Sequence, residues 1–225
     1  MAIITAIEVD RFHRGRVRVS VDGRPTLSLH RRSLKSLGLR EGQVVDQTDL
    51  SVQALEAEKV TAHAGALDFL ARQGYSAREL SRRLAGRGFG EEVVQGEIAR
   101  LKRAGLVDDE RLAKDYVDHR LSTRPAGRRL LRAELTRRGV GRQAVEKAVA
   151  RAPAGGSADE LTLARESARA RLAGRAARIA NADSKTVMKL RKQLLDYLLR
   201  RGFSFETAEK VVREAISDRE TGEGE

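Results

Sequence analysis

Few side chains of this sequence could do chemistry, and their spacing fits none of the common reaction types. The four histidines, His13, His30, His63 and His119, do not form a His-Glu-x-x-His motif or another zinc-ligand spacing. The sequence has no Cys, which excludes thiolate nucleophiles, disulfides and Cys-ligated metals. It also has no Gly-x4-Gly-Lys-Ser/Thr loop for nucleotide phosphates. These residues therefore predict no metal site and no phosphate-binding loop.

Two further patterns resemble functional sites only superficially. The segment Gly86-Arg-Gly-Phe-Gly90 is rich in glycine, but it follows an expected helix, whereas a dinucleotide-binding loop follows a strand. Asp108 and Asp109 could bind a metal ion in an enzyme acting on nucleic acid, yet capping of the next helix explains them better. We therefore expect no catalytic residue, no metal and no cofactor, and we interpret the chain as a binding protein and not an enzyme.

The charge of the sequence favours binding of a polyanion. The formal net charge is +12, and residues 60–216 carry 33 Lys or Arg against 20 Asp or Glu. Of the 44 cations, 35 are Arg, whose planar guanidinium can bind phosphate or carboxylate through two hydrogen bonds. A coding bias toward Arg would give the same composition. Nucleic acid, anionic lipid or an acidic protein would each suit this charge.

The candidate binding residues are cations that recur beside an apolar Leu stripe in three parts of the chain. They are Arg82, Arg83, Arg87, Arg128, Arg129, Arg132, Arg137, Arg138, Lys189, Arg191, Lys192, Arg200 and Arg201. A single basic helix face is usually just solvated, but three such faces favour contact with a polyanion. Aromatic residues are scarce around them, which argues against binding dominated by base stacking.

The first fifty residues predict a small β unit. Apolar and polar residues alternate over 17–21 and again over 26–29, on either side of the turn pair Asp22-Gly23. This pattern is typical of a β-hairpin, in which Gly23 would take a positive φ angle. Pro25 lacks an N–H group, so the second strand should lie at an edge of the sheet.

Three glycines, Gly88, Gly139 and Gly202, mark copies of one helical unit. Each has Leu four and eight residues before it and an apolar residue directly after it. The leucines are Leu80, Leu84, Leu131, Leu135, Leu194 and Leu198. Leucines four residues apart share one helix face, and a glycine after them suits a left-handed helix end. The sequence therefore predicts three related helical units.

We accordingly expect a mainly α fold, with three tandem three-helix repeats forming an elongated curved array and a small N-terminal β-hairpin unit. The first helix of the third repeat is expected over about 158–180. The expected boundaries are a β unit at 1–50, repeats at 51–105, 106–152 and 153–217, and an acidic disordered tail at 218–225.

The helical part resembles the RecX family, regulatory proteins that restrain the bacterial recombinase RecA. The first matching segment is Ala66-Leu-Asp-Phe-Leu-Ala-Arg-Gln-Gly-Tyr-Ser-Ala-Arg-Glu-Leu80, and the second, Gly105-Leu-Val-Asp-Asp-Glu-Arg-Leu-Ala113, is the most specific. Gly127, Glu134-Leu135 and Arg138-Gly139-Val140 extend the match in the second repeat. The resemblance covers about residues 60–217, and Leu112 stands where the family usually has Phe.

The resemblance implies a protein that binds RecA filaments on DNA and inhibits their recombinase, coprotease and ATPase activities. It would thereby modulate recombination, DNA repair and the SOS response. It also implies weak, sequence-independent binding to single- and double-stranded DNA. We further expect a cytoplasmic monomer, and the absence of Cys fits the cytoplasm. We expect no membrane span, because no stretch approaches 18 consecutive apolar residues. The alternative is an autonomous DNA-binding protein with helix-turn-helix-like units.

Overall fold

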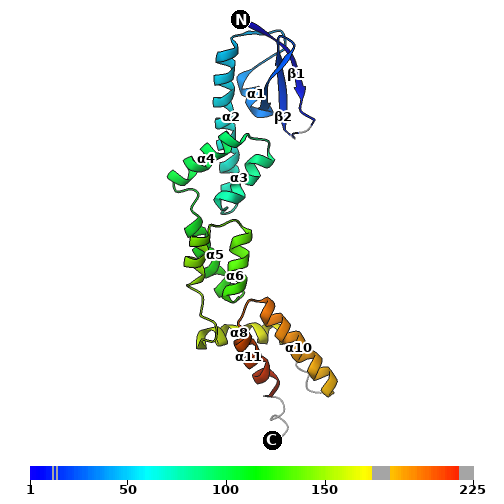
Figure 1. Ribbon diagram of the computed structural model, residues 1–225, viewed down its shortest axis with the longest axis vertical. Helices are drawn as coiled ribbons and strands as arrows, with labels where there is room; N and C mark the ends of the chain where they lie inside the picture. Colours follow the sequence, from blue (N-terminus) through cyan, green and yellow to red (C-terminus); the bar gives the residue numbers. More distant parts are fainter. Residues whose placement is uncertain (12, 14, 174–182, 218–225) are drawn as a thin grey trace. The chain divides into compact units, whose positions relative to one another are not determined.

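The computed structural model describes residues 1–11, 13, 15–173 and 183–217 (Figure 1). The chain forms two compact units, Met1–Asp108 and Asp109–Glu225. The mainly helical fold with a small N-terminal strand unit is confirmed. The expected acidic tail and the last seven residues of the helix expected over 158–180 lie outside the described residues. The repeat boundaries stay predictions.

The first unit begins with a four-stranded antiparallel sheet in the order β3-β2-β1-β4. Its strands are β1 (Ala2–Val9), β2 (Arg16–Val21), β3 (Arg24–His30) and β4 (Val44–Val45). Asp22 and Gly23 connect β2 to β3 with φ angles of 49° and 76°, as a two-residue hairpin turn requires. β3 lies at an edge of the sheet, as the position of Pro25 predicted.

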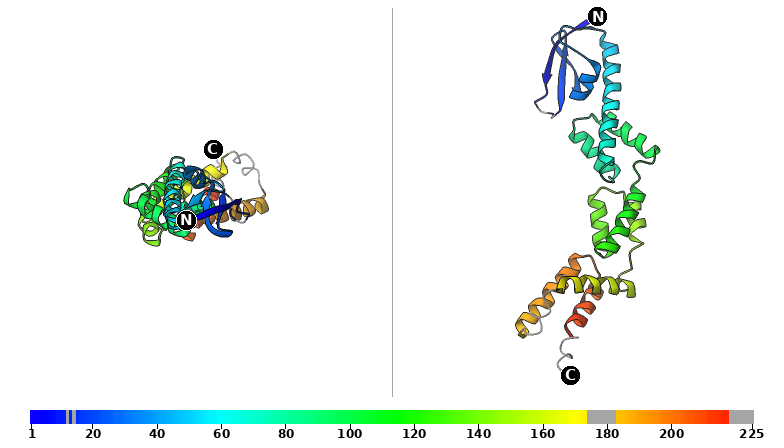
Figure 2. Two further views of the ribbon diagram at one scale, coloured as in Figure 1. Left: turned by 90° about the horizontal axis from the view of Figure 1, so that it is seen from above. Right: turned by 180° about the vertical axis from the view of Figure 1, so that it is seen from behind.

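One long helix supplies two separate cores in the first unit. Helix α1 (Arg31–Leu37) and the 24-residue helix α2 (Gln47–Leu70) follow β3, and β4 lies between them. Leu50 and Ala54 of α2 pack with the inner face of the sheet. About two to three turns after Ala54, Ala62 and Ala66 pack with the next two helices. The β unit and the first helical group therefore share a continuous element (Figure 2).

A buried carboxylate fixes the sheet onto this shared helix. Glu58 of α2 accepts the backbone N–H of His30 at 2.6 Å and forms an ion pair with Arg16 Nη1 at 3.1 Å. Arg16 Nη1 also donates to the backbone oxygen of Gly88. The ring of His30 stacks on Phe89 with 4.9 Å between centroids. These contacts position the β unit directly against the glycine turn of the first helical group.

The first helical group consists of α2, α3 (Ala77–Gly86) and α4 (Glu91–Arg103). Ser76 and Glu79 form a reciprocal capping box at the start of α3. Leu80 and Leu84 are fully buried and form the centre of the core of this group.

The second unit contains two further helical groups. The first consists of α5 (Asp109–Thr123), α6 (Arg128–Arg137) and α7 (Arg142–Val149). The described helices of the second group are α8 (Ala158–Leu172), α10 (Ser184–Arg200) and α11 (Phe205–Ser217). Leu131 and Leu135 are buried in the core formed by α5, α6 and α7. Leu194 and Leu198 are buried in the core formed by α8, α10 and α11. The Leu stripes predicted from the sequence are therefore the buried faces of α6 and α10.

The three marker glycines share one helix-ending geometry. Gly88, Gly139 and Gly202 have φ angles of 91°, 79° and 82°. The N–H of the apolar residue after each glycine donates to the carbonyl of the Leu four residues before the glycine, at 3.2–3.3 Å. This is the hydrogen bond of a Schellman cap, and it closes each second helix.

The carboxylate of Glu160 in α8 stabilises the start of α11 by accepting hydrogen bonds there. It accepts the N–H of Gly156 at 2.8 Å, the N–H of Ser204 at 3.1 Å and the Ser204 hydroxyl at 2.7 Å. The hydroxyl of Thr207 also donates to it. The residue is only 3% exposed. Burial alone would raise the pKa of Glu160, but hydrogen bonds from Thr207, Ser204 and Gly156 outweigh it and hold the pKa below its ordinary value.

We expect Glu160→Gln to lower the free energy of unfolding of the second unit by about 1–3 kcal/mol, because an amide N–H₂ would replace one acceptor among four donors. The folded-state pKa is the lowered one. The stabilisation is therefore fully present above the ordinary glutamate pKa and is lost as pH falls through the folded-state pKa. Hydrogen exchange of α11 amides at neutral and acidic pH would measure both effects. Asp159→Asn, an exposed neighbour with the same charge change, is the control. Equal effects of the two variants would contradict the role of Glu160.

Candidate polyanion-binding surface

The second helix of each group carries the predicted cations, but their environments differ. On α3, Arg82 and Arg83 are exposed, and Arg87 at its end is half-buried. The Arg83 guanidinium lies 4.5 Å from the ring centroid of Tyr75, and that of Arg87 lies 4.0 Å from Phe69. Such cation–π contacts orient the planar guanidinium over the face of a ring.

Helix α6 uses most of its arginines inside the second unit. Arg128 donates to the backbone oxygens of Ala152 at 2.8 Å and Ala150 at 3.1 Å, both at the end of α7. Arg132 pairs with Glu146 through two bonds of 2.7 and 2.8 Å. This hydrogen bonding raises the pKa of Arg132 and lowers the pKa of Glu146. These two arginines therefore hold α6 against α7, although Arg132 remains exposed.

The other cations of α6 also differ in their contacts: some have partners within the second unit and one is exposed without a hydrogen bond or ion pair among the described residues. Arg129 donates to the backbone oxygen of Leu199 in α10 at 2.6 Å. The guanidinium of Arg138 lies 5.6 Å from the ring of Tyr116. Arg137 is exposed, and within the described residues no hydrogen bond or ion pair engages its side chain.

Helix α10 presents the most accessible group of cations. Lys189, Arg191, Lys192 and Arg200 are exposed, and among the residues that the structure describes none of the four side chains forms a hydrogen bond or ion pair. Four cations without an internal carboxylate partner keep their full charge for an external anion.

The prediction that Arg201 lies on an outer face is wrong. Arg201 is only 8% exposed, and its Nη2 donates to the backbone oxygens of Arg124, at 2.7 Å, and Pro125. Its side chain folds inward because those two carbonyls, in the loop between α5 and α6, have no helical partner to accept from. For all thirteen cations, Arg201 included, a binding role stays a prediction.

The structure adds one exposed cluster that is not among the cations predicted from the sequence. Arg100, Lys102 and Arg103 occupy the last turn of α4, a third helix, and all three are exposed. The run Arg-Leu-Lys-Arg was a visible signal, but cations in a last helical turn are also expected from the helix dipole. We therefore treat this cluster as an addition to the candidate surface of the first unit.

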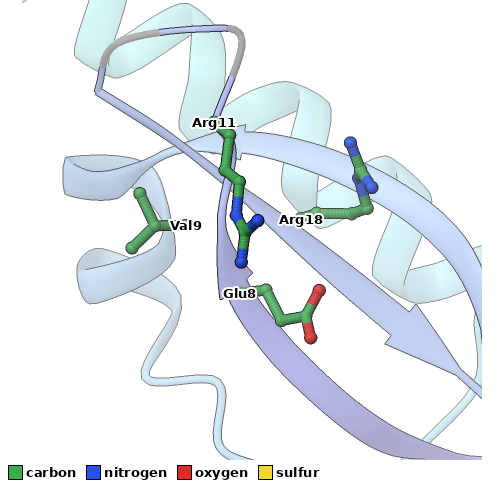
Figure 3. Close-up of a pocket in the computed structure, with 4 residues that line it drawn as sticks. All are labelled: Glu8, Val9, Arg11 and Arg18. Atoms are coloured by element: carbon green, nitrogen blue, oxygen red, sulfur yellow. The ribbon is translucent and has the colours of Figure 1, made fainter.

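The sheet carries a cavity of about 570 Å³ that does not share this basic character. It is lined by Glu8, Val9, Arg11 and Arg18, and the Arg11 guanidinium points toward Glu8 while that of Arg18 points away from it (Figure 3). Glu8 and Arg18 are directly opposed on β1 and β2. Glu8 offsets part of the charge of the two arginines, and Arg18 also pairs with Asp10 at 4.0 Å, so this cavity is less basic than the exposed helix faces.

The described residues contain no group of three His, Asp or Glu side chains arranged to hold a metal ion. His63 contacts Glu97 through Nδ1 at 2.8 Å, which joins α2 to α4. In the same part of the chain, no helix combines the length and apolar character needed to cross a membrane.

Comparison with known families matches two of the three helical groups. Residues 62–101 match the first three-helix domain of RecX, and residues 108–149 match the second. The regulatory protein RecX of Amycolatopsis mediterranei is 33% identical over 154 residues, covering 67% of this chain and 81% of that protein. That of Levilactobacillus brevis is 32% identical over 147 residues, but the match spans only 54% of its length.

Other relatives extend over nearly the whole chain. The regulatory protein RecX of Clostridium acetobutylicum is 25% identical over 215 residues, which cover 96% of this chain and 97% of that protein. A crystal structure of regulatory protein RecX superposes with a TM-score of 0.59 at 23% identity, covering 97% of this chain and all of that one. RecX from Lactobacillus salivarius shares the fold with a TM-score of 0.56 at 19% identity. With its two RecX three-helix domains and these relatives, the chain belongs to the RecX family of regulatory proteins.

Proposed function

We propose that this protein binds RecA filaments on DNA and inhibits the recombinase, coprotease and ATPase activities of RecA. It would thereby modulate homologous recombination, DNA repair and the SOS response in the cytoplasm. Membership of the RecX family supports this proposal. The observation that carries it is the recurrence of exposed cations on α3, α6 and α10, above all the four on α10.

The filament is a suitable target for such a surface because it presents a repeating polyanion together with protein. Three helical groups, each with a basic second helix, can contact several equivalent positions along one filament. Each single contact to phosphate is weak and depends on salt, whereas several linked contacts add through effective concentration. The same reasoning makes binding to bare single- or double-stranded DNA weak and independent of sequence. We propose that the protein acts as a monomer.

A titration of the purified protein into RecA assembled on single-stranded DNA tests this proposal. We expect the DNA-dependent ATPase rate and the yield of strand exchange to fall as the protein is added, with marked inhibition at or below equimolar amounts. Unchanged ATPase and strand exchange at equimolar protein would contradict it. An ATPase that uses no DNA is the control for nonspecific inhibition.

A further inference from the structure

A cavity of about 490 Å³ lies in the second unit, where the end of α5 meets α8 and α10. Its walls include Arg124 after α5, Ser167 and Arg171 on α8, and Tyr197 and Arg201 on α10. Of the thirteen predicted cations, only the inward-facing Arg201 lines it. Its volume is within the range of small-molecule sites, roughly 300–1,000 Å³.

Two buried polar groups at this cavity lack a hydrogen-bond partner. The hydroxyl of Ser167 and the Nε of Arg201 are both buried, and in the part of the chain that the structure describes neither has a donor or acceptor within reach. Their residues are 5% and 8% exposed. An unpaired buried polar group costs free energy, so two of them at one cavity call for a physical cause.

The charges around the cavity are unbalanced in favour of cations. Arg124, Arg171 and Arg201 contribute three guanidinium groups, whereas Glu166 is the single carboxylate among the lining residues. Burial lowers the pKa of Arg201, and the nearby Arg120 and Arg124 lower it further, while Tyr197 and Glu134 act in the opposite direction. A guanidinium stays protonated in proteins, so its burial without a carboxylate partner is unfavourable.

We propose that this cavity is a binding site for a phosphate group. A phosphate oxygen accepts hydrogen bonds from guanidinium N–H groups and from hydroxyls, and its negative charge would offset the excess of Arg124, Arg171 and Arg201. The cavity has room for a nucleoside attached to the phosphate, with Tyr197 in its wall. The site goes beyond filament binding by the exposed cations, and it does not depend on RecA.

The phosphate could be free or part of a nucleic acid strand, and the two sources predict different competition. Free phosphate or a mononucleotide would bind the cavity without displacement by an oligonucleotide. A strand that inserts a phosphodiester would compete with free phosphate for the same arginines. Both sources use the same residues.

The test uses the full-length chain and the NMR signals of arginine Nε–H groups. Sodium phosphate is added against sodium chloride at constant ionic strength. We expect a saturable shift of the Arg201 signal, and Arg171→Gln should weaken phosphate binding about tenfold, as loss of one charge-assisted hydrogen bond predicts. Arg169→Gln is the matched control, because Arg169 is an exposed arginine in the same last turn of α8 and does not line the cavity.

Ser167→Ala keeps the test valid if Arg171→Gln disturbs folding. Removing an unpaired buried hydroxyl should leave thermal stability unchanged or raise it, while phosphate binding weakens about threefold. Oligothymidylate is then added to the phosphate-bound protein: displacement identifies a strand as the source, and no displacement identifies free phosphate. The proposal is overturned if the Arg201 signal shows no saturable shift, which would mean that water alone fills the cavity. Equal effects of Arg169→Gln and Arg171→Gln would also overturn it.

Discussion

Replacing Gly202 with alanine should lower the free energy of unfolding of the second unit by about 3–5 kcal/mol, because it adds backbone strain to a steric clash. Gly202 has a φ angle of 82°. A Cβ atom there would lie 2.3 Å from the backbone nitrogen of Leu130 and 2.9 Å from the oxygen of Gly127. These neighbours are backbone atoms and cannot rotate away. Hydrogen exchange of amides in α6 and α10 would measure the loss in this unit.

Two control variants separate the two causes. Gly127 needs no positive φ angle, but a Cβ atom there would lie 2.0 Å from the oxygen of Gly202, so Gly127→Ala introduces the clash alone. Gly105 has a φ of 68° and nothing within 4 Å of an added Cβ, so Gly105→Ala introduces the strain alone, worth about 1–2 kcal/mol in its own unit. If Gly202→Ala costs no more than Gly105→Ala, the close approach of the two glycines has no energetic importance.

The expected loss is large because this contact joins the two helical groups of the second unit. The N–H of Gly127 donates to the oxygen of Arg201 at 2.9 Å, and Arg201 donates back to the carbonyls of Arg124 and Pro125. Arg129 adds a bond to Leu199. Separation of the two backbones would break all of these bonds while leaving both Leu stripes intact. The helices should therefore persist while their mutual packing is lost.

Structural features that depend only on residues close to one another in the sequence could be predicted from it. A Leu stripe followed by glycine, as at Leu135 and Gly139, encodes a buried helix face and its cap within one short segment. Asp22-Gly23 likewise encodes a hairpin turn through the φ angles that these two residues tolerate. In both cases the physical cause lies within about ten residues, so a single sequence contains it.

The fate of individual cations could not be predicted, because their partners are distant in sequence. Arg129 and Arg201 donate to carbonyls 70 and 77 residues away, and backbone carbonyls leave no signature in a sequence. The dual role of α2 was hidden for the same reason. Its helical periodicity is visible, but the assignment of Leu50 to one core and Ala66 to another depends on tertiary packing.

Only cations without bonds inside the protein can test DNA binding without disturbing the fold. Charge changes at Arg128, Arg129 or Arg132 would break bonds to Ala152, Leu199 or Glu146 and thus confound binding with folding. The exposed cations of α10 have no such bonds among the described residues. They are therefore the appropriate positions for substitution.

Changing Lys189, Arg191 and Lys192 together to Gln should weaken binding to oligothymidylate by about tenfold or more near 0.1 M salt. Each lost phosphate contact means that fewer counterions are released from the strand on binding, and this release favours the complex. The plot of log affinity against log salt should become shallower by about 2, at about 0.7 per contact for a single strand. Fluorescence anisotropy over a salt series measures both quantities. Circular dichroism should show unchanged helicity, because these side chains are exposed.

The control triple changes Arg31, Lys35 and Arg40 to Gln, three exposed cations of the β unit. Both triples lower the formal net charge from +12 by three, so a nonspecific effect of total charge would make their salt slopes equal. Equal slopes would contradict phosphate contacts on α10.

Binding to duplexes of different sequence completes the experiment. Our proposal requires equal affinities, whereas strong preference for one sequence that survives moderate salt would favour an autonomous helix-turn-helix-like reader, since base contacts depend less on counterion release than phosphate contacts do.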